Sequence, residues 1–470
     1  MILRGEYGVA ETDAMVKVLK GIGAGLAAVL VAAVALYAVS WLRGPSAQER
    51  QALALLQNPP PPAEGADGFA ALWSLPYRVP AAERNQILRQ DIERFSRIPL
   101  PGAAAKESNV YFAGIAAQRY PALENAAAGD PEWCRWRATG CLAQVRDAMP
   151  AYAALLQRHA ALLANAAELS AYAHFRNPFP PRPDMPFPPY QSLSRSLTGH
   201  AYTFVSGDRE AALAGVCADT GTARRLISGS HSLIGSMIGS AMLEGNVSLF
   251  ADMLAELPRQ HPLPAVCGEA FAPMTALQDD ICRMMLGEGR YVLAGLSAYE
   301  AIEPDGSLET SKAARMFYDS GKTAARMAPR FAWYCGEAAR SQLAADLPLH
   351  DSTPPPSRWS LACVSNLAGC ILADIGGPDL QEYARRLQDA NARLRMATAL
   401  LWLRRQDAGE RMERTALSGL PQSLRSAGRE LLMDAGSPEL TSAAYAKPIA
   451  DGPAGASLRL PLPLPGSRLP

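Results

Sequence analysis

The chain has 470 residues, of which 45 are lysine or arginine and 45 are aspartate or glutamate, so its formal net charge at pH 7 is zero. A protein without net positive charge has no general attraction for nucleic acid, which is therefore not an expected partner. Hydrophobic residues make up 49% of the chain, enough for one large buried core or two of ordinary size.

The longest uncharged segment lies near the N-terminus and reads GIGAGLAAVLVAAVALYAVSWL, from Gly21 to Leu42. A bilayer core is about 30 Å thick and a helix rises about 1.5 Å per residue, so this segment can span it with some tilt. A cleaved signal peptide has a shorter apolar region of about 7 to 15 residues, followed by a small-residue cleavage site. The nearest such site is Ala-Val-Ser at 38–40, which bulky Trp41 follows directly. The segment predicts a retained transmembrane helix at 21–42, with a cleaved leader and a buried soluble helix as alternatives.

Basic residues flank this helix on both sides, with MVKVLK at 15–20 before it and Arg43 and Arg50 after it. The resulting bias toward a cytoplasmic N-terminus is slight, and it is stronger if translation starts at Met15. We expect residues 1–20 to form a cytoplasmic segment. The abundance of alanine, proline and arginine is typical of proteins that are encoded by GC-rich bacterial genomes. The expected location is therefore the bacterial inner membrane, with one span, the lipid bilayer as a partner and the large domain in the periplasm.

Beyond the span, residues 43–65 predict a membrane-proximal helix and a spacer that is stiffened by the prolines at 59–62. Residues 66–447 predict an α-helical exported domain, because apolar residues recur there at helical spacing. The expected fold class is mainly α, an irregular multi-helix domain behind a transmembrane helix. An α-solenoid is the alternative arrangement, although no fixed repeat period supports it. Residues 448–470 predict a flexible tail, in which SLRLPLPLP from Ser457 can donate one short edge strand.

A proline-rich segment interrupts the helical pattern at 176–190, RNPFPPRPDMPFPPY. Its overlapping P-x-x-P spacings are those of an extended polyproline II ligand. The favoured interpretation is a strap packed over helices, because Phe179, Phe187 and Tyr190 need burial.

All eight cysteines follow the predicted span: Cys134, Cys141, Cys217, Cys267, Cys282, Cys335, Cys363 and Cys370. An even number in an exported domain indicates disulfides, and eight cysteines permit about 105 pairings. Two local pairs bracket loop-like segments and can close, Cys134 with Cys141 and Cys267 with Cys282. By contrast, LACVSNLAGC predicts a helix, which would hold its two cysteines roughly 10 Å apart, beyond disulfide reach. Buried free thiols are the alternative for each cysteine.

The segment DSGKTAAR, Asp319 to Arg326, ends like a phosphate-binding loop in Gly321, Lys322 and Thr323. That motif requires a glycine five residues before Gly321 and a preceding strand. The chain has Met316 and a helical pattern there instead, so no nucleotide or other cofactor is expected.

The remaining candidate chemistry is dispersed. The six histidines show no metal-binding spacing, so no metal site is expected: His159, His174, His200, His231, His261 and His350. Asp279, Asp280 and Glu288 can act as acid and base in a hydrolase, but any helical protein offers such carboxylates. The sequence therefore assigns no catalytic residue.

The segment LISGSHSLIGSMIGSAML, residues 226–243, carries no formal charge but contains five serines and three glycines. This composition is too polar for favourable membrane insertion, so a central buried helix is favoured over a second span. Gly235 and Gly239 are four residues apart, which predicts close helix packing on that face.

The segments CLAQVRDAM, LIGSMIGSAMLEG and RLRMATALLWLRRQ, in this order behind an N-terminal span, resemble uncharacterised single-span membrane-anchored bacterial envelope proteins with a helical exported domain. The resemblance implies fold and location, and no catalytic residue. The expected function is binding of a protein or an envelope component. An envelope hydrolase with dispersed carboxylates or a histidine is the alternative, and an immunity or chaperone-like role is a variant of the first hypothesis.

Overall fold

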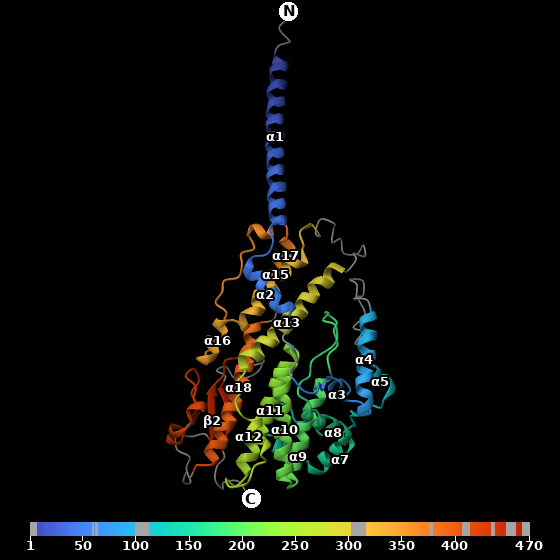
Figure 1. The fold of residues 1–470 in the computed structure, drawn as a ribbon, viewed down its shortest axis with the longest axis vertical. Coiled ribbons are helices and arrows are strands. Elements are labelled where there is room, and N and C mark those ends of the chain that lie inside the picture. Colours follow the sequence, from blue (N-terminus) through green and yellow to red (C-terminus); the bar gives the residue numbers. More distant parts are fainter. Residues whose placement is uncertain are drawn as a thin grey trace, which may run out of the picture. The chain divides into compact units, whose positions relative to one another are not determined.

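The computed structural model describes residues 7–58, 61, 64–98, 112–301, 316–375, 379–406, 414–433, 438–447 and 457–462. The structure is mainly α-helical, with an apolar N-terminal helix followed by a multi-helix domain, which confirms the predicted fold class (Figure 1). The chain forms two compact units, which are described separately. Unit 1 consists of residues 1–53, 303–329 and 353–376, and unit 2 consists of residues 54–302, 330–352 and 377–470.

Unit 1 contains the apolar helix α1 (Tyr7–Leu42), in which the predicted span is included. Its other elements are η4 (Leu361–Cys363), α17 (Leu367–Ile375) and the first part of α15 (Ser320–Ala332). The segment Met15–Leu42 is long and apolar enough to cross a membrane, and none of its most apolar window is buried in protein. The sequence did not indicate that segments near residues 320 and 365 belong to the same unit as this helix.

Unit 2 contains most of the helices. After α2 (Ala47–Gln57), which begins in unit 1, they are, in chain order, α3 (Phe69–Trp73), α4 (Ala81–Arg97), α5 (Ile115–Arg119), α6 (Cys141–Asp147), α7 (Met149–Arg158), α8 (Ala160–Glu168), η1 (Leu169–Ala171), η2 (Tyr190–Ser194), α9 (Arg195–Val205), α10 (Arg209–Gly229), α11 (Leu233–Glu256), α12 (Val266–Ala270), α13 (Leu277–Ala301), the end of α15, η3 (Trp333–Cys335), α16 (Glu337–Ala344), α18 (Leu380–Arg404), η5 (Arg414–Gly419) and η6 (Gln422–Leu424).

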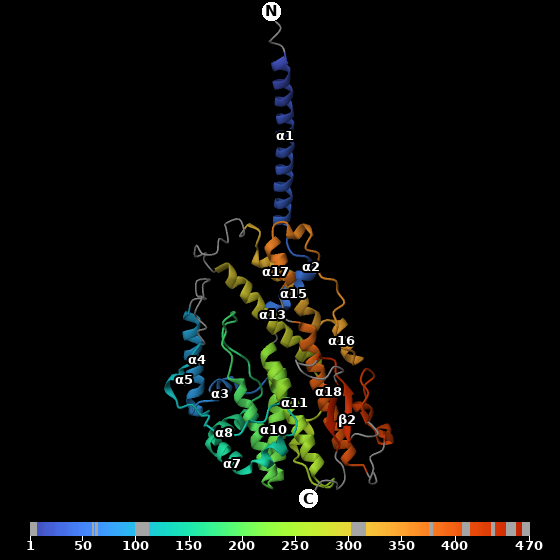
Figure 2. The same ribbon diagram turned by 180° about the vertical axis from the view of Figure 1, so that it is seen from behind.

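The centre of unit 2 is the pair α10 and α11, which lie side by side in both views (Figures 1 and 2). Helices α9 and α12 pack on α10, and α18 packs on α11 although more than a hundred residues separate them in the chain. Helix α11 is also long and apolar enough to span a membrane, but 72% of its most apolar window is buried in the protein. The contacts are those of an irregular bundle, in which an apolar helix forms the core.

The predicted single helix over 226–243 is in fact the end of one helix and the start of the next. Helix α10 ends at Gly229, and α11 begins at Leu233 after Ser232, whose side chain accepts a hydrogen bond from the Gly235 N–H at 3.1 Å. Between them His231 adopts φ 51°, a left-handed conformation that turns the chain back on itself. The expectation of one helix was wrong because a serine N-cap can restart a helix without any proline or charge.

The two glycines of the predicted packing face have different neighbours. A Cβ on Gly239 would lie 2.6 Å from the carbonyl oxygen of Ala223 and 3.0 Å from the Ile227 side chain, both on α10. A Cβ on Gly235 would instead lie 2.5 Å from the Ser230 hydroxyl, in the turn between the helices. Gly239 therefore marks the point where α10 and α11 cross closely, and Gly235 accommodates the turn.

The proline-rich segment lies against helices through its aromatic residues. Phe179 is 3% exposed and packs with Phe69, Trp73 and Phe95 of α3 and α4. Tyr190 is also buried. Phe187 is only partly buried, with its ring centroid 6.5 Å from that of Tyr291 on α13. The segment is thus a strap packed against helices.

A three-stranded antiparallel sheet ends unit 2, in the order β1 (Leu432–Met433), β2 (Glu439–Ala443) and β3 (Ser457–Pro461). Strand β3 is an edge strand in which Leu458 and Leu460 are buried. The predicted short edge strand from Ser457 is thus present, because alternating leucines give it an apolar face to bury. This stretch is therefore ordered, unlike the flexible tail predicted for 448–470 as a whole. The rest of the predicted tail, at 448–456 and from 463 onward, lies outside the described residues.

All eight cysteines form disulfides, paired as Cys134–Cys141, Cys217–Cys267, Cys282–Cys335 and Cys363–Cys370. One of the two proposed local pairs is formed, whereas Cys267–Cys282 is wrong because each of these cysteines bonds to a residue on another helix or turn. The exclusion of Cys363–Cys370 is also wrong. The chain leaves helical geometry between η4 and α17, which brings these two Cα atoms to 5.8 Å.

We expect the long-range disulfides to contribute more stability than the local ones. By loop-closure entropy, Cys217–Cys267, with a sequence separation of 50, contributes about 4 kcal/mol and Cys134–Cys141, with a separation of 7, about 2.5 kcal/mol. Chemical denaturation of the two double alanine variants measures the difference, and non-reducing peptide mapping checks the pairing. Equal losses, or a larger loss for the local pair, would contradict the ranking.

The close crossing at Gly239 predicts a cost for the smallest added side chain. Gly239→Ala should lower the free energy of unfolding by about 1 to 3 kcal/mol, because the methyl group meets backbone of α10. Gly199→Ala in α9 is the matched control, since its Cβ would have ordinary contacts of 3.6 Å or more. The control should be neutral or up to about 1 kcal/mol more stable. Denaturant unfolding of the full-length protein in detergent that finds the two variants equal would refute the close crossing.

Candidate functional site

Several hydrogen bonds of unit 1 are made at the C-terminal end of α1. Ser40 is fully buried, although it lies in the last turn of a helix whose preceding residues are largely exposed. Its hydroxyl donates a hydrogen bond to Ser365 Oγ at 2.9 Å and accepts one from the Ser365 N–H at 2.9 Å. We call Tyr37, Ser40, Trp41, Lys322 and Ser365 the anchor socket.

Lys322 provides the charge of the anchor socket. Its ammonium group donates to the carbonyl oxygens of Ser40 at 3.0 Å and Trp41 at 2.8 Å, and contacts Ser365 Oγ at 3.3 Å. The last carbonyls of a helix have no partner within the helix and carry its partial negative charge. A lysine placed there supplies both the missing donors and the opposite charge, so it caps α1.

A buried polar network positions Lys322 and Ser365. Asp319 accepts a hydrogen bond from the Lys322 N–H at 2.8 Å at the start of α15, and its own N–H donates to Asn366 Oδ1 at 2.8 Å. Asn366 in turn donates to Thr323 Oγ1 at 3.1 Å. Gly369 allows this approach, because a Cβ there would overlap the Thr323 hydroxyl. The network holds α15 and the start of α17 together beneath the helix end.

Apolar residues surround the anchor socket. The Tyr37 hydroxyl donates to the Met316 carbonyl oxygen at 2.6 Å, and its ring contacts Phe317 edge-on at 5.8 Å. Several large apolar side chains of unit 1 are exposed: Trp41, Leu42, Met316, Phe317, Trp359, Leu367, Ile371 and Leu372. Trp359 is the extreme case at 88% exposed.

The sequence analysis missed this site. The segment that resembles a phosphate-binding loop, Gly321 to Thr323, contributes the lysine that caps α1 and a threonine of the supporting network. A local pattern cannot reveal this role, because Ser40 and Ser365 are 325 residues apart in the chain.

The carboxylates considered for catalysis lie on α13. Asp280 is buried, which raises its pKa to about 6, and its nearest cation is Arg283 at 3.8 Å. Burial also raises the pKa of Glu288. Eight residues of helix separate these two by about 12 Å, whereas paired glycosidase carboxyl groups lie about 5 to 9.5 Å apart. Asp279 is exposed. The three do not assemble an acid–base pair.

The histidines are likewise dispersed. His200 Nε2 lies 2.9 Å from Asp219, His159 Nδ1 lies 2.9 Å from the Leu155 carbonyl oxygen, and His350 Nδ1 lies 3.0 Å from Gln381. Within the described part of the chain no three metal-ligating side chains come together. His174 and His231 differ from these, since each has a buried Nδ1 without a hydrogen-bond partner.

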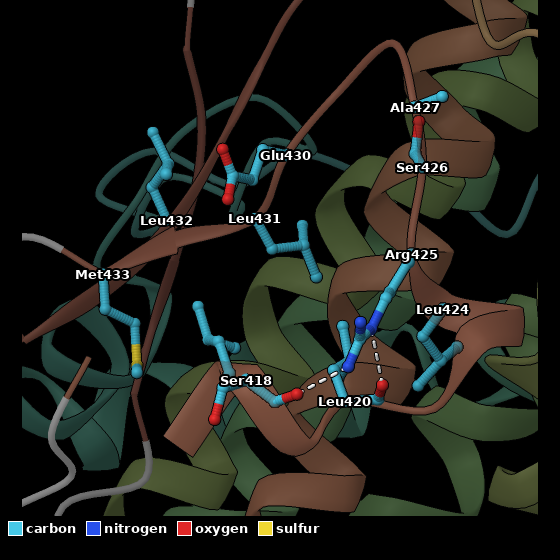
Figure 3. A pocket seen from close by; sticks show the side chains of 11 residues that line it. Ser418, Leu420, Leu424, Arg425, Ser426, Ala427, Glu430, Leu431, Leu432 and Met433 are labelled. Atoms are coloured by element: carbon cyan, nitrogen blue, oxygen red, sulfur yellow. Dashed lines mark hydrogen bonds between the residues drawn. The ribbon is translucent and has the colours of Figure 1, made fainter. Parts of the chain in front are cut away.

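A pocket of about 620 Å³ lies near the sheet in unit 2, lined by residues between Leu417 and Met433 (Figure 3). The Arg425 guanidinium that faces it donates to the carbonyl oxygens of Leu420 at 2.8 Å and Ser418 at 2.5 Å. Seven of its eleven lining residues are apolar, five of them leucine, and Glu430 is the carboxylate among the lining residues. These groups hold the wall together and do not form a catalytic set.

No family model matches the chain, and no curated protein or solved structure shows significant similarity to it.

The anchor socket predicts that Lys322 stabilises the end of α1. Lys322→Met should increase hydrogen exchange of the amides in residues 36–42 between about twofold and thirtyfold, since a cation at a helix C-terminus contributes about 0.3 to 2 kcal/mol. Lys447→Met, at an exposed lysine of unit 2, is the control and should leave this exchange unchanged. Unchanged protection of residues 36–42 in Lys322→Met would show that the lysine does not cap the helix.

Proposed function

We propose that this chain is a single-pass protein of the bacterial inner membrane that keeps α1 as its anchor and uses a large helical periplasmic domain to bind a protein or an envelope component. The observation that carries the proposal is the anchor socket. The end of α1 is joined by hydrogen bonds to a folded unit that also contains residues 303–329 and 353–376.

The contacts of Ser40 support retention of the helix. Cleavage after the Ala-Val-Ser site at 38–40 would remove the buried Ser40 hydroxyl and leave Ser365 without its partner. It would also remove the Tyr37 contacts to Met316 and Phe317. A leader that is removed during export cannot contribute such contacts to the fold of the mature protein. Retention therefore fits the structure of unit 1 better than cleavage.

The disulfides support export of the part that follows α1. Four pairs use every cysteine of the chain, in both units. Disulfides persist in oxidising compartments such as the bacterial periplasm and are rare in the cytosol. With one span and an exported domain, we infer a cytoplasmic location for residues 1–20.

The exposed apolar side chains of unit 1 support a position at the membrane surface. Trp41, Trp359 and Ile371 are exposed on the same unit as the end of the span. Tryptophan favours the interface between lipid and water, where its apolar ring and its N–H group are both accommodated. A domain tethered there meets envelope components at a high effective concentration, which favours a binding function. The resemblance to single-span envelope proteins is part of this proposal.

The proposed topology predicts opposite results for two reporter positions. An alkaline phosphatase fused after Pro470 should be active in a bacterial host, because that enzyme requires disulfides that form only after export. The same phosphatase fused directly after Lys20, before the span, should be inactive. A cytoplasmic fluorescent reporter should give the reverse pattern at both positions. Phosphatase activity at Lys20 without activity after Pro470 would invert the topology.

A further inference from the structure

A cluster of arginines and histidines lies where the turn between α10 and α11 meets α13 and the start of the strap. It consists of His174, Arg176, His231, Arg283 and Arg290, all within unit 2. We call it the cationic cluster.

Two close backbone contacts bring the cationic cluster together. A Cβ on Gly287 of α13 would overlap the carbonyl oxygen of His231. Arg283 and Arg290 lie four residues before and three residues after Gly287, on the same face of α13, so both are directed toward the turn that contains His231. Gly287 is required because any side chain would push α13 away from this turn.

The second contact joins the strap to the end of α10. The Phe175 N–H donates to the Gly229 carbonyl oxygen at 3.4 Å, and a Cβ on Gly229 would lie 2.8 Å from the His174 Cβ. Arg176 follows His174 by two residues in an extended segment and so lies on the same side of it. His174 and His231 therefore both lie next to the C-terminal end of α10.

The charges of the cationic cluster are only partly balanced by its neighbours. Among the described residues, no ion pair joins Arg176 or Arg290 to a carboxylate, whereas Arg283 lies 3.8 Å from Asp280. Asp67 accepts the backbone N–H groups of Phe69 and Arg176, and its carboxyl group also interacts electrostatically with His174 and Arg176. Burial, and then the charge of Arg176, lower the pKa of Arg290. Among the described residues, the partly buried Arg290 guanidinium thus has no carboxylate of its own.

The two histidines add unused hydrogen-bonding atoms. His174 is 5% exposed and His231 is 8% exposed, and the Nδ1 atom of each is buried without a partner. Burial, and then the charges of Arg176, Arg283 and Arg290, lower the pKa of His231 to about 4, so it is neutral at pH 7. The left-handed backbone of His231 is a further strain at this position. Buried polar atoms without partners cost stability unless a ligand satisfies them.

We propose that the cationic cluster binds a phosphate-type oxyanion between Arg176 and Arg290, with His174 and His231 donating imidazole N–H groups. Arginine recognises phosphate oxygens in a bidentate manner, and the N-terminus of α11 directly after His231 adds a favourable partial positive charge. The phosphate belongs either to a soluble phosphate compound or to a phospholipid headgroup. The proposal does not depend on the membrane topology.

The test uses full-length protein in dodecyl maltoside, a detergent without phosphate. Thermal unfolding and titration calorimetry with sodium phosphate are compared with sodium chloride at equal ionic strength. A second arm omits free phosphate and adds phosphatidylglycerol to the micelles. Stabilisation by free phosphate identifies a soluble ligand, and stabilisation by phosphatidylglycerol alone identifies a lipid headgroup.

The variants Arg290→Gln and Arg176→Gln should each weaken binding about tenfold or more, because each removes a charged hydrogen-bonding partner. Without phosphate, both variants should melt no earlier than the wild type, because neither arginine has an ion-pair partner in the protein. Loss of an arginine with a purely structural role would instead lower the melting temperature. Arg135→Gln, at an exposed arginine outside the cluster, should behave as the wild type throughout. A wild type that responds to neither phosphate source overturns the proposal, as does an undiminished response in both cluster variants.

Discussion

The hydrogen bonds between Lys322 and the last carbonyl groups of α1 are the interaction on which the arrangement of unit 1 depends. Helix α1 satisfies its own backbone along its length, as a membrane-spanning helix must. Its last turn cannot do so, because the chain ends its helical path there. Lys322 donates to the carbonyl oxygens of Ser40 and Trp41 in that turn, and the buried Ser40–Ser365 hydroxyl pair connects the turn to the segment before α17. The end of α1 is consequently part of a folded unit.

The two long apolar helices show that composition alone does not determine where a helix lies. Both α1 and α11 are long and apolar enough to cross a membrane, but none of the most apolar window of α1 is buried in the protein, whereas 72% of that of α11 is buried. Gly239 lets α10 approach so closely that the helix is covered by protein on that side. In α1, by contrast, large apolar side chains such as Leu30 and Val31 point outward and require an apolar solvent.

The features that sequence reasoning predicted are those with a local physical cause. The uncharged run at 21–42 and the buried aromatics of the strap could be inferred, because length and side-chain type are enough to explain them. The Cys363–Cys370 bond could not, since it depends on a three-residue break between η4 and α17. The anchor socket and the cationic cluster could not be predicted from the sequence either. They join residues as far apart as Ser40 and Ser365, or His174 and Arg290, whose proximity only the tertiary packing determines.

Retention of α1 is the central claim, and the mass of the native protein tests it most directly. Membranes of the source organism are washed with alkaline carbonate, which removes proteins that do not span the bilayer. The protein is then extracted and its intact mass measured. The account predicts that the protein stays in the washed membranes with a mass that includes residues 21–42, whether its first residue is Met1 or Met15. A protein found in the soluble periplasmic fraction, with an N-terminus after Ser40, would contradict it.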